Sequence, residues 1–144
     1  MSSEQLELGP VDIVVIGFPP DAPRTGESIP LVIDLVDRGI IRVLDVLLIQ
    51  KDADGTIAEL EINELGAHVE VFDGASTGMI GSEDAAVAGA GLEPGEAAVL
   101  LCFENTWAAP FVTSVMRNGG RVLGFERIPA EDLIETLAAL EAAE

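Results

Sequence analysis

The sequence has little basic charge, a single cysteine and a single histidine. Among its 144 residues, 7 are Lys or Arg and 26 are Asp or Glu, so the formal net charge is −19. A field of that sign repels nucleic acids and anionic membrane surfaces, which predicts that neither is a partner. Cys102 alone provides no disulfide framework and no cysteine-rich metal site, and it favours a reducing, cytoplasmic location.

Export and membrane signals are also missing. Residues 1–9 carry acids where a secretory signal has positive charge, and we expect them to form a flexible tail of one domain that covers residues 1–144. The most apolar run, residues 40–49, is interrupted by Arg42 and Asp45 and is shorter than the ~20 residues that span a bilayer. The sequence therefore predicts no membrane insertion.

Apolar residues nevertheless make up 49% of the chain, which is enough for a packed core. β-Branched runs predict strands at 11–18, 40–51 and 56–62, and a helix is expected from Thr25 or Ser28 to Arg38. Residues 95–123 read as a strand, a short helix and a second strand, and further helices are expected over 82–89 and 130–143. The predicted fold is an α/β (α+β) two-layer sandwich, ferredoxin-like. It has two βαβ halves, 11–50 and 95–123, an added hairpin strand and a C-terminal helix.

The strand over residues 40–50 is apolar on both of its faces. Leu44, Val46 and Leu48 share one face, and the opposite face is equally apolar. The C-terminal helix or the 63–94 segment is one candidate cover for the second face. The other is a second copy of the chain, with Leu44, Val46 and Leu48 at the contact and a dimer as the first expectation.

Two short segments are candidate ligand sites. Arg24, Thr25, Gly26 and Ser28 stand at a helix start, where free N–H groups, hydroxyls and a guanidinium favour an anion, although helix capping explains the same residues. Residues 52–55, Asp-Ala-Asp-Gly, are similar to the opening of a calcium loop, but their position between two strands favours a hairpin turn.

The segment Glu104, Asn105, Thr106 and Trp107 is the candidate recognition segment, because it places the one tryptophan at a helix start directly after an apolar strand. Helix capping by Asn105 or Thr106 and packing of Trp107 against the sheet is the structural alternative. Cys102 lies within the apolar strand, where burial raises the pKa of a thiol, so we expect it to pack and not to react.

No combination of residues predicts catalysis or a bound cofactor or metal. The chain has no G-x-G-x-x-G loop, no Walker lysine, and no serine or cysteine beside its one histidine. The leading hypothesis is a non-catalytic, self-associating interaction or regulatory module. The alternative is a small-molecule binding protein or enzyme that uses the open sheet face or the helix start at Arg24–Ser28.

Several short motifs carry a family resemblance. They are Leu8-Gly9-Pro10-Val11-Asp12, Arg42-Val43-Leu44-Asp45, Lys51-Asp52-Ala53-Asp54-Gly55, Leu92-Glu93-Pro94-Gly95, Glu104-Asn105-Thr106-Trp107-Ala108-Ala109-Pro110 and Gly119-Gly120. With these motifs the chain resembles an uncharacterised family of small bacterial domains of unknown function. It is also distantly similar to predicted membrane-associated stress proteins with a glycine-rich apolar middle hairpin. Residues 63–94 are shorter and more acidic than that hairpin. The resemblance implies the fold and no catalytic residue, substrate or cofactor.

Overall fold

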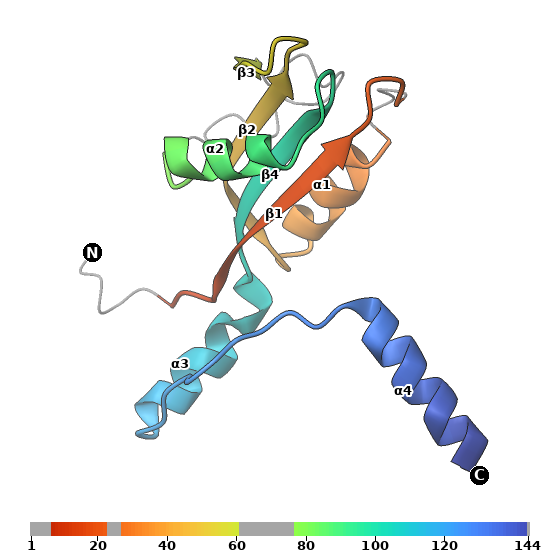
Figure 1. The fold of residues 1–144 in the computed structure, drawn as a ribbon. Helices are drawn as coiled ribbons and strands as arrows, with labels where there is room; N and C mark the ends of the chain where they lie inside the picture. The colour runs from red at the N-terminus through yellow and green to blue at the C-terminus, as the bar shows by residue number, and fades with distance from the viewer. Residues whose placement is uncertain (1–6, 23–26, 61–76, 144) are drawn as a thin grey trace.

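The computed structural model describes residues 7–22, 27–60 and 77–143 (Figure 1). Its elements are, in chain order, β1 Val11–Phe18, α1 Ile29–Asp37, β2 Arg42–Lys51, β3 Ile57–Leu60, α2 Ser82–Ala90, β4 Ala97–Glu104, the 3-10 turn η4 Thr106–Ala108, α3 Ala109–Arg117 and α4 Ala130–Ala143. The predicted α+β class is confirmed. None of the helices described is long and apolar enough to cross a membrane.

Within the described ranges, four strands form one antiparallel sheet in the order β1-β4-β2-β3. β4 lies between β1 and β2 and pairs with both, whereas β1 and β3 are the edges of this described sheet. Because β1 and β2 are both antiparallel to β4, they run in the same direction, and so do β3 and β4. The sheet therefore contains two interleaved βαβ units, β1-α1-β2 and β3-α2-β4, each split by a strand of the other.

The composition of the second unit corrects a prediction. Residues 95–123 were expected to form a complete βαβ unit, but residues 120–129 contain no strand. The reason lies in the pairing of β4, because β1 occupies one side of it and β2 the other. A strand that follows α3 therefore finds no free position beside β4. The unit is completed instead by β3 and α2, and the finer ferredoxin-like arrangement is not confirmed.

A β-bulge in β2 sets which residues face which side of the sheet. Val43 pairs with Phe103 and Asp45 pairs with Cys102, so Leu44 is the additional residue. An additional residue reverses the inside-outside alternation along a strand. From Asp45 onward, the odd-numbered residues of β2 therefore share a face with Cys102, and the even-numbered residues share the opposite face with Leu101.

The core lies between the sheet and α2, which crosses in front of β2 and β4 in Figure 1. Ile49, Ala98 and Leu100 are fully buried there, and Ala85 of α2 packs against them. Gly89 lets α2 approach closely, since a Cβ at this position would lie 2.7 Å from Ile57 Cδ1.

The ends of two elements agree with their local sequence signals. The Lys51 ammonium donates to the carbonyls of Gly89 and Leu92 at 3.2 and 3.0 Å and so satisfies acceptors at the end of α2. Residues 52–55 form the turn between β2 and β3, where Gly55 has φ +89° and its N–H donates to the Asp52 carbonyl. The Thr56 N–H donates to the Asp54 carboxylate, which lowers the pKa of that carboxyl.

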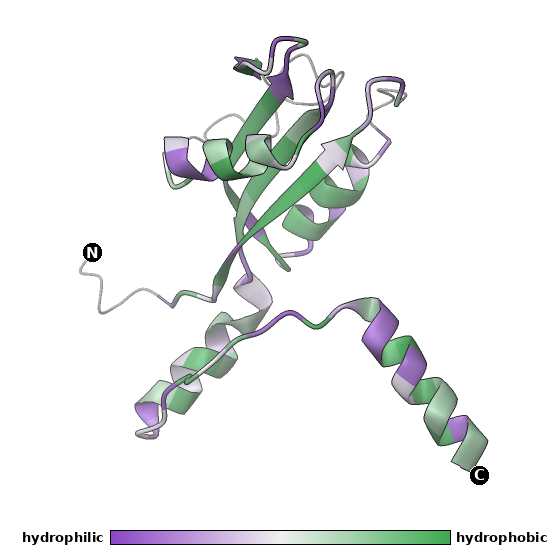
Figure 2. Ribbon diagram, viewed as in Figure 1, coloured by the Kyte–Doolittle hydropathy of each residue, from purple (hydrophilic) through white to green (hydrophobic). Residues whose placement is uncertain are grey.

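Two parts of the structure leave their apolar side chains exposed. β1 exposes apolar side chains on both of its faces, although its composition is that of a buried strand (Figure 2). Residues 121–143, called here the C-terminal arm, comprise an extended segment followed by α4, and every residue of the arm is exposed. The predicted helix over 130–143 is present, but it projects away from the sheet and does not cover it (Figure 1).

Candidate functional site

The segment Glu104–Trp107 ends β4 and begins η4, and its first residue is a buried carboxylate. The Glu104 side chain is 3% exposed. One of its oxygens accepts the Gly9 N–H at 2.7 Å, and the other lies 2.9 Å from the Arg42 guanidinium. Gly9 is required at this position, since a Cβ there would lie 2.0 Å from the Asn105 carbonyl oxygen. Glu104 thus joins the approach to β1, the start of β2 and the end of β4.

Asn105 is buried and completes this junction. Its backbone N–H and its Nδ2 both donate to the Pro10 carbonyl, at 2.8 and 3.0 Å. The same Nδ2 donates to the Asp12 carboxylate at 2.8 Å. Sequence analysis expected Asn105 or Thr106 to cap a helix. Asn105 does stand at the N-terminus of η4 but makes no side-chain capping bond there, because its Oδ1, the atom that would accept a backbone N–H, accepts the indole N–H of Trp107.

Trp107 has the polar partner expected for its indole N–H, which donates to Asn105 Oδ1 at 3.3 Å. Trp107 as a whole residue is 57% exposed, so it does not pack closely against the sheet. Its backbone N–H donates to the Ile40 carbonyl, which fixes η4 beside the start of β2.

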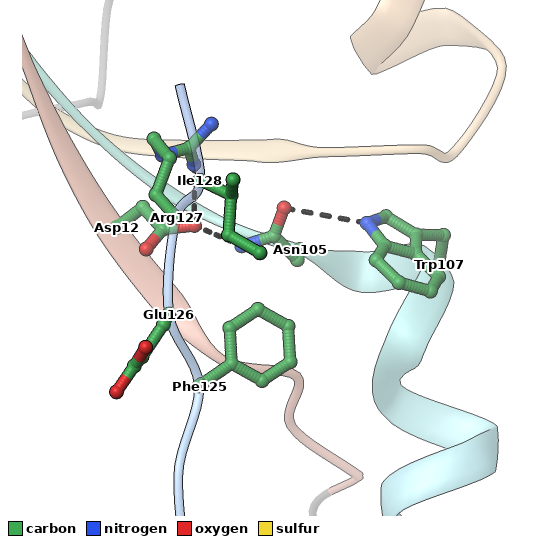
Figure 3. Close-up of a pocket in the computed structure, with 7 residues that line it drawn as sticks. All are labelled: Asp12, Asn105, Trp107, Phe125, Glu126, Arg127 and Ile128. Carbon is green, nitrogen blue, oxygen red and sulfur yellow. Dashed lines mark hydrogen bonds and ion pairs between the residues drawn. The ribbon is translucent and has the colours of Figure 1, made fainter. Parts of the chain in front are cut away.

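A pocket of about 360 Å³ lies between this segment and the C-terminal arm (Figure 3). Arg127 of the arm donates to the Asp12 carboxylate at 3.2 Å, and Asp12 also accepts from Asn105. Phe125 and Ile128 supply apolar walls. In Figure 3, three contacts follow one another in a continuous row: Arg127 with Asp12, Asp12 with Asn105, and Asn105 with Trp107.

This cluster holds elements together and provides little reactive chemistry. Every buried side-chain nitrogen or oxygen in the described ranges has a hydrogen-bond partner. The row of contacts contains no hydroxyl, thiol or imidazole, and its one carboxylate, Asp12, accepts hydrogen bonds from Arg127 and Asn105. It can position the arm, and its exposed Trp107 and Phe125 can contact another molecule.

Of the four predicted anion-site residues, Ser28 is the one that the structure describes. Arg24, Thr25 and Gly26 lie outside the described residues. Ser28 stands at the N-terminus of α1 without a side-chain capping bond, and Pro30 lies in the first turn as expected. Anion binding at this helix start stays a prediction.

The three residues predicted to contact a second copy lie in β2 with different exposures. Leu48 is buried, at 4% exposed, whereas Leu44 and Val46 are half-buried. The bulge removes Leu44 from the regular alternation, and its carbonyl accepts both the N–H and the hydroxyl of Thr77. Whether these residues touch another copy stays a prediction, but more exposed apolar surface lies on β1.

Asp45 is buried at the bulge and was not among the predicted site residues. Its carboxylate accepts the Ile80 N–H at 2.9 Å and its neighbour's Val46 N–H at 3.1 Å, and so attaches the chain before α2 to β2. The sequence signal for this role was an aspartate within the apolar run of residues 40–49, because a buried carboxylate needs hydrogen-bond donors.

Cys102 is fully buried opposite Asp45, as expected of a packing cysteine. Burial raises the pKa of its thiol, and the charges of Asp45 and Asp84 raise that pKa further. Within the described ranges, no group of three or more His, Cys, Asp or Glu side chains could hold a metal ion.

Comparison with known proteins identifies a family. The model of a family described as a family of unknown function, DUF6325, matches residues 7–143, which is nearly the whole chain. No curated protein and no solved structure matches. The distant resemblance to membrane-associated stress proteins gains no support from these comparisons. The chain therefore belongs to DUF6325, a family of unknown function.

Proposed function

We propose that this protein is a non-catalytic, self-associating interaction module of the cytoplasm. The observation that carries the proposal is the exposed apolar surface of β1. This eight-residue strand has the composition of a buried strand, yet its large apolar side chains are 37–50% exposed.

The chemistry of the exposed surface supports association. Large apolar side chains are exposed along β1 and along the C-terminal arm, and contiguous exposed apolar surface marks interaction sites. The charge of −19 disfavours nucleic acid and anionic membranes as the binding partner. A protein partner, beginning with a second copy of the chain, fits this surface best.

The junction around Glu104 and Asn105 supports a module over an enzyme. Its polar groups are occupied in holding β1, β4 and η4 together. The single thiol is buried, and its raised pKa opposes the reactive thiolate. A buried, reduced cysteine also suits the cytoplasm.

The test is the mass of the full chain, measured by light scattering coupled to size-exclusion chromatography over a wide range of protein concentration. We expect about 30 kDa, twice the 15.1 kDa of one chain, with dissociation only on strong dilution. A mass of one chain at every concentration would refute self-association.

A further inference from the structure

We propose that two copies pair edge to edge through β1, and that the C-terminal arm of each copy lies across the β1 strand of the other. This inference rests on the proposed self-association and specifies the surfaces that produce it. It joins two observations on the described residues: an unprotected strand edge and an exposed apolar helix in the same chain.

Among the residues that the structure describes, β1 is an edge strand of the sheet and pairs only with β4. Six large apolar side chains of β1 are between 37% and 50% exposed, and they project from both faces: Val11, Ile13, Val14, Val15, Ile16 and Phe18. Soluble proteins usually protect such an edge with lysines, prolines or bulges. β1 contains none of these, and its one charged residue, Asp12, is already paired with Arg127.

The edge is therefore suited to strand addition, in which backbone hydrogen bonds join two sheets and side chains on each face pack across the junction. A second β1 supplies the same apolar side chains on both faces. An antiparallel β1–β1 pair has two-fold symmetry, the commonest symmetry of soluble oligomers, and joins two four-stranded sheets into one.

The C-terminal arm supplies the cover that this joined sheet needs. Leu133, Leu137 and Leu140 recur at helical spacing on α4, with Ile134 beside them, and all are at least half exposed. The 14 residues of α4 are about 21 Å long, close to the roughly 27 Å of an eight-residue strand. Each chain thus carries one uncovered strand and one uncovered helix of similar length.

The position of the arm favours the second copy over the arm's own chain. Arg127 holds the arm at the first residues of β1 through Asp12, at 3.2 Å. From there the arm leads to α4, which lies apart from the sheet (Figure 1) and has no buried residue. Its apolar side chains therefore stay exposed within one chain and are available to a second copy.

A standard interface buries roughly 1,600 Å² in total, about 800 Å² from each copy, and the exposed apolar side chains of β1 and α4 are the surface that supplies it in this pair. The acidic chain repels a copy of itself, and α4 brings acids such as Glu131 and Glu135 near the contact, but the paired strand residues 13–18 carry no charge.

The first test compares two identical substitutions at exposed valines. Val15→Lys places a charge in the β1 edge, where Val15 is 50% exposed, and Val87→Lys places it on α2, where Val87 is 76% exposed. We expect Val15→Lys to raise the dimer dissociation constant at least about 100-fold, since the two-fold axis introduces the charge twice, and Val87→Lys to change it less than about 3-fold. Circular dichroism checks that both variants are folded.

The second test uses disulfide trapping and remains informative if Val15→Lys does not fold. Full-length Val15→Cys is mixed with each of three full-length arm variants, Leu133→Cys, Leu137→Cys and Leu140→Cys, and is then oxidised mildly. We expect at least one mixture to form a disulfide between molecules. The parent chain is the control, because its only thiol is buried.

The outcomes separate this inference from the proposed function. A dimer that withstands Val15→Lys and forms no trapped species leaves self-association standing and overturns the β1 and arm assignment. A disulfide formed only within one chain, in the double variant Val15→Cys/Leu137→Cys, shows that α4 folds back on its own strand and also overturns it. A chain that is monomeric throughout refutes both proposals.

Discussion

Removing the buried carboxylate of Glu104 is expected to destabilise the protein strongly, because three segments meet at this side chain. Glu104→Ala leaves the Gly9 N–H without its acceptor, removes the partner of Arg42 and opens space in a site that is 3% exposed. An orphaned buried N–H costs about 1–3 kcal/mol, and the lost charge-assisted bonds and packing add to it. We expect a loss of about 3 kcal/mol in the free energy of unfolding.

Two further variants divide that loss into its parts. Glu104→Gln keeps an acceptor for the Gly9 N–H and nearly the same volume, so we expect a loss of about 1 kcal/mol. Arg42→Ala leaves the Glu104 carboxylate buried with one donor. Because Arg42 itself is 58% exposed, we expect a loss of about 1–2 kcal/mol, below the value for a fully buried pair.

The matched control is Arg38→Ala, which removes an arginine from the exposed pair with Asp34 on α1. Exposed i,i+4 pairs contribute about 0.3–0.5 kcal/mol, so this variant stays close to the parent. Urea unfolding of all variants at one protein concentration measures the differences, since any association adds a concentration-dependent term. Equal effects of Arg42→Ala and Arg38→Ala, or an Ala variant at Glu104 as stable as the parent, would refute the assigned role of the carboxylate.

Three other perturbations test separate parts of the structure. Asp45→Ala should cost about 2 kcal/mol in urea unfolding, because the Ile80 N–H loses its acceptor, and an unchanged midpoint would contradict this anchoring role. Native Cys102 should react with a thiol reagent only at the rate of unfolding. Because burial raises the pKa of this thiol, its contribution to the free energy of unfolding is fully present below the ordinary pKa of 9.0 and decreases as the pH rises above that value. A free energy of unfolding that increases between pH 9 and 10 would contradict the assignment. Dimerisation should strengthen with added salt, which screens the repulsion between two chains of charge −19, and sedimentation that shows the reverse would argue for an ion-paired interface.

The sequence predicted most individual elements well, because their signals are local. The strand over 11–18 and the helix over 130–143 have the predicted bounds. The first is a β-branched run that two prolines end, and the second begins directly after Pro129. The turn at 52–55 was equally legible from its aspartates and glycine.

The strand order was not predictable from the same signals, since it depends on contacts between distant residues. Residues 121–123, Arg-Val-Leu, were expected to begin a strand, yet β4 already has two neighbours and offers them no edge. The bulge at Leu44 was not predictable either. Where both faces of a strand are apolar, the sequence does not show which residues face which side, so an additional residue leaves no signal.

The candidate site was half predictable. Glu104–Trp107 stood out because it joins a buried strand to a helix start. Its partners Gly9, Asp12 and Arg127 did not, because the contacts join residues distant in sequence: Gly9 is 95 residues before Glu104, Asp12 is 93 before Asn105, and Arg127 is 115 after Asp12. The one local signal for these partners was the Gly9-Pro10 pair directly before β1, because glycine permits a close backbone approach and proline restricts where the backbone can run.

The properties of β1 and the charge of the chain are best understood together. An eight-residue apolar edge strand without a lysine, proline or bulge is a site for uncontrolled strand addition. The net charge of −19 opposes the close approach of many chains, and its effect grows with every copy added. A two-fold β1 pair uses the edge once and leaves no second free β1, so the growth ends at two copies. Strong negative charge and a single adhesive edge therefore favour the same result, a closed dimer over an open aggregate.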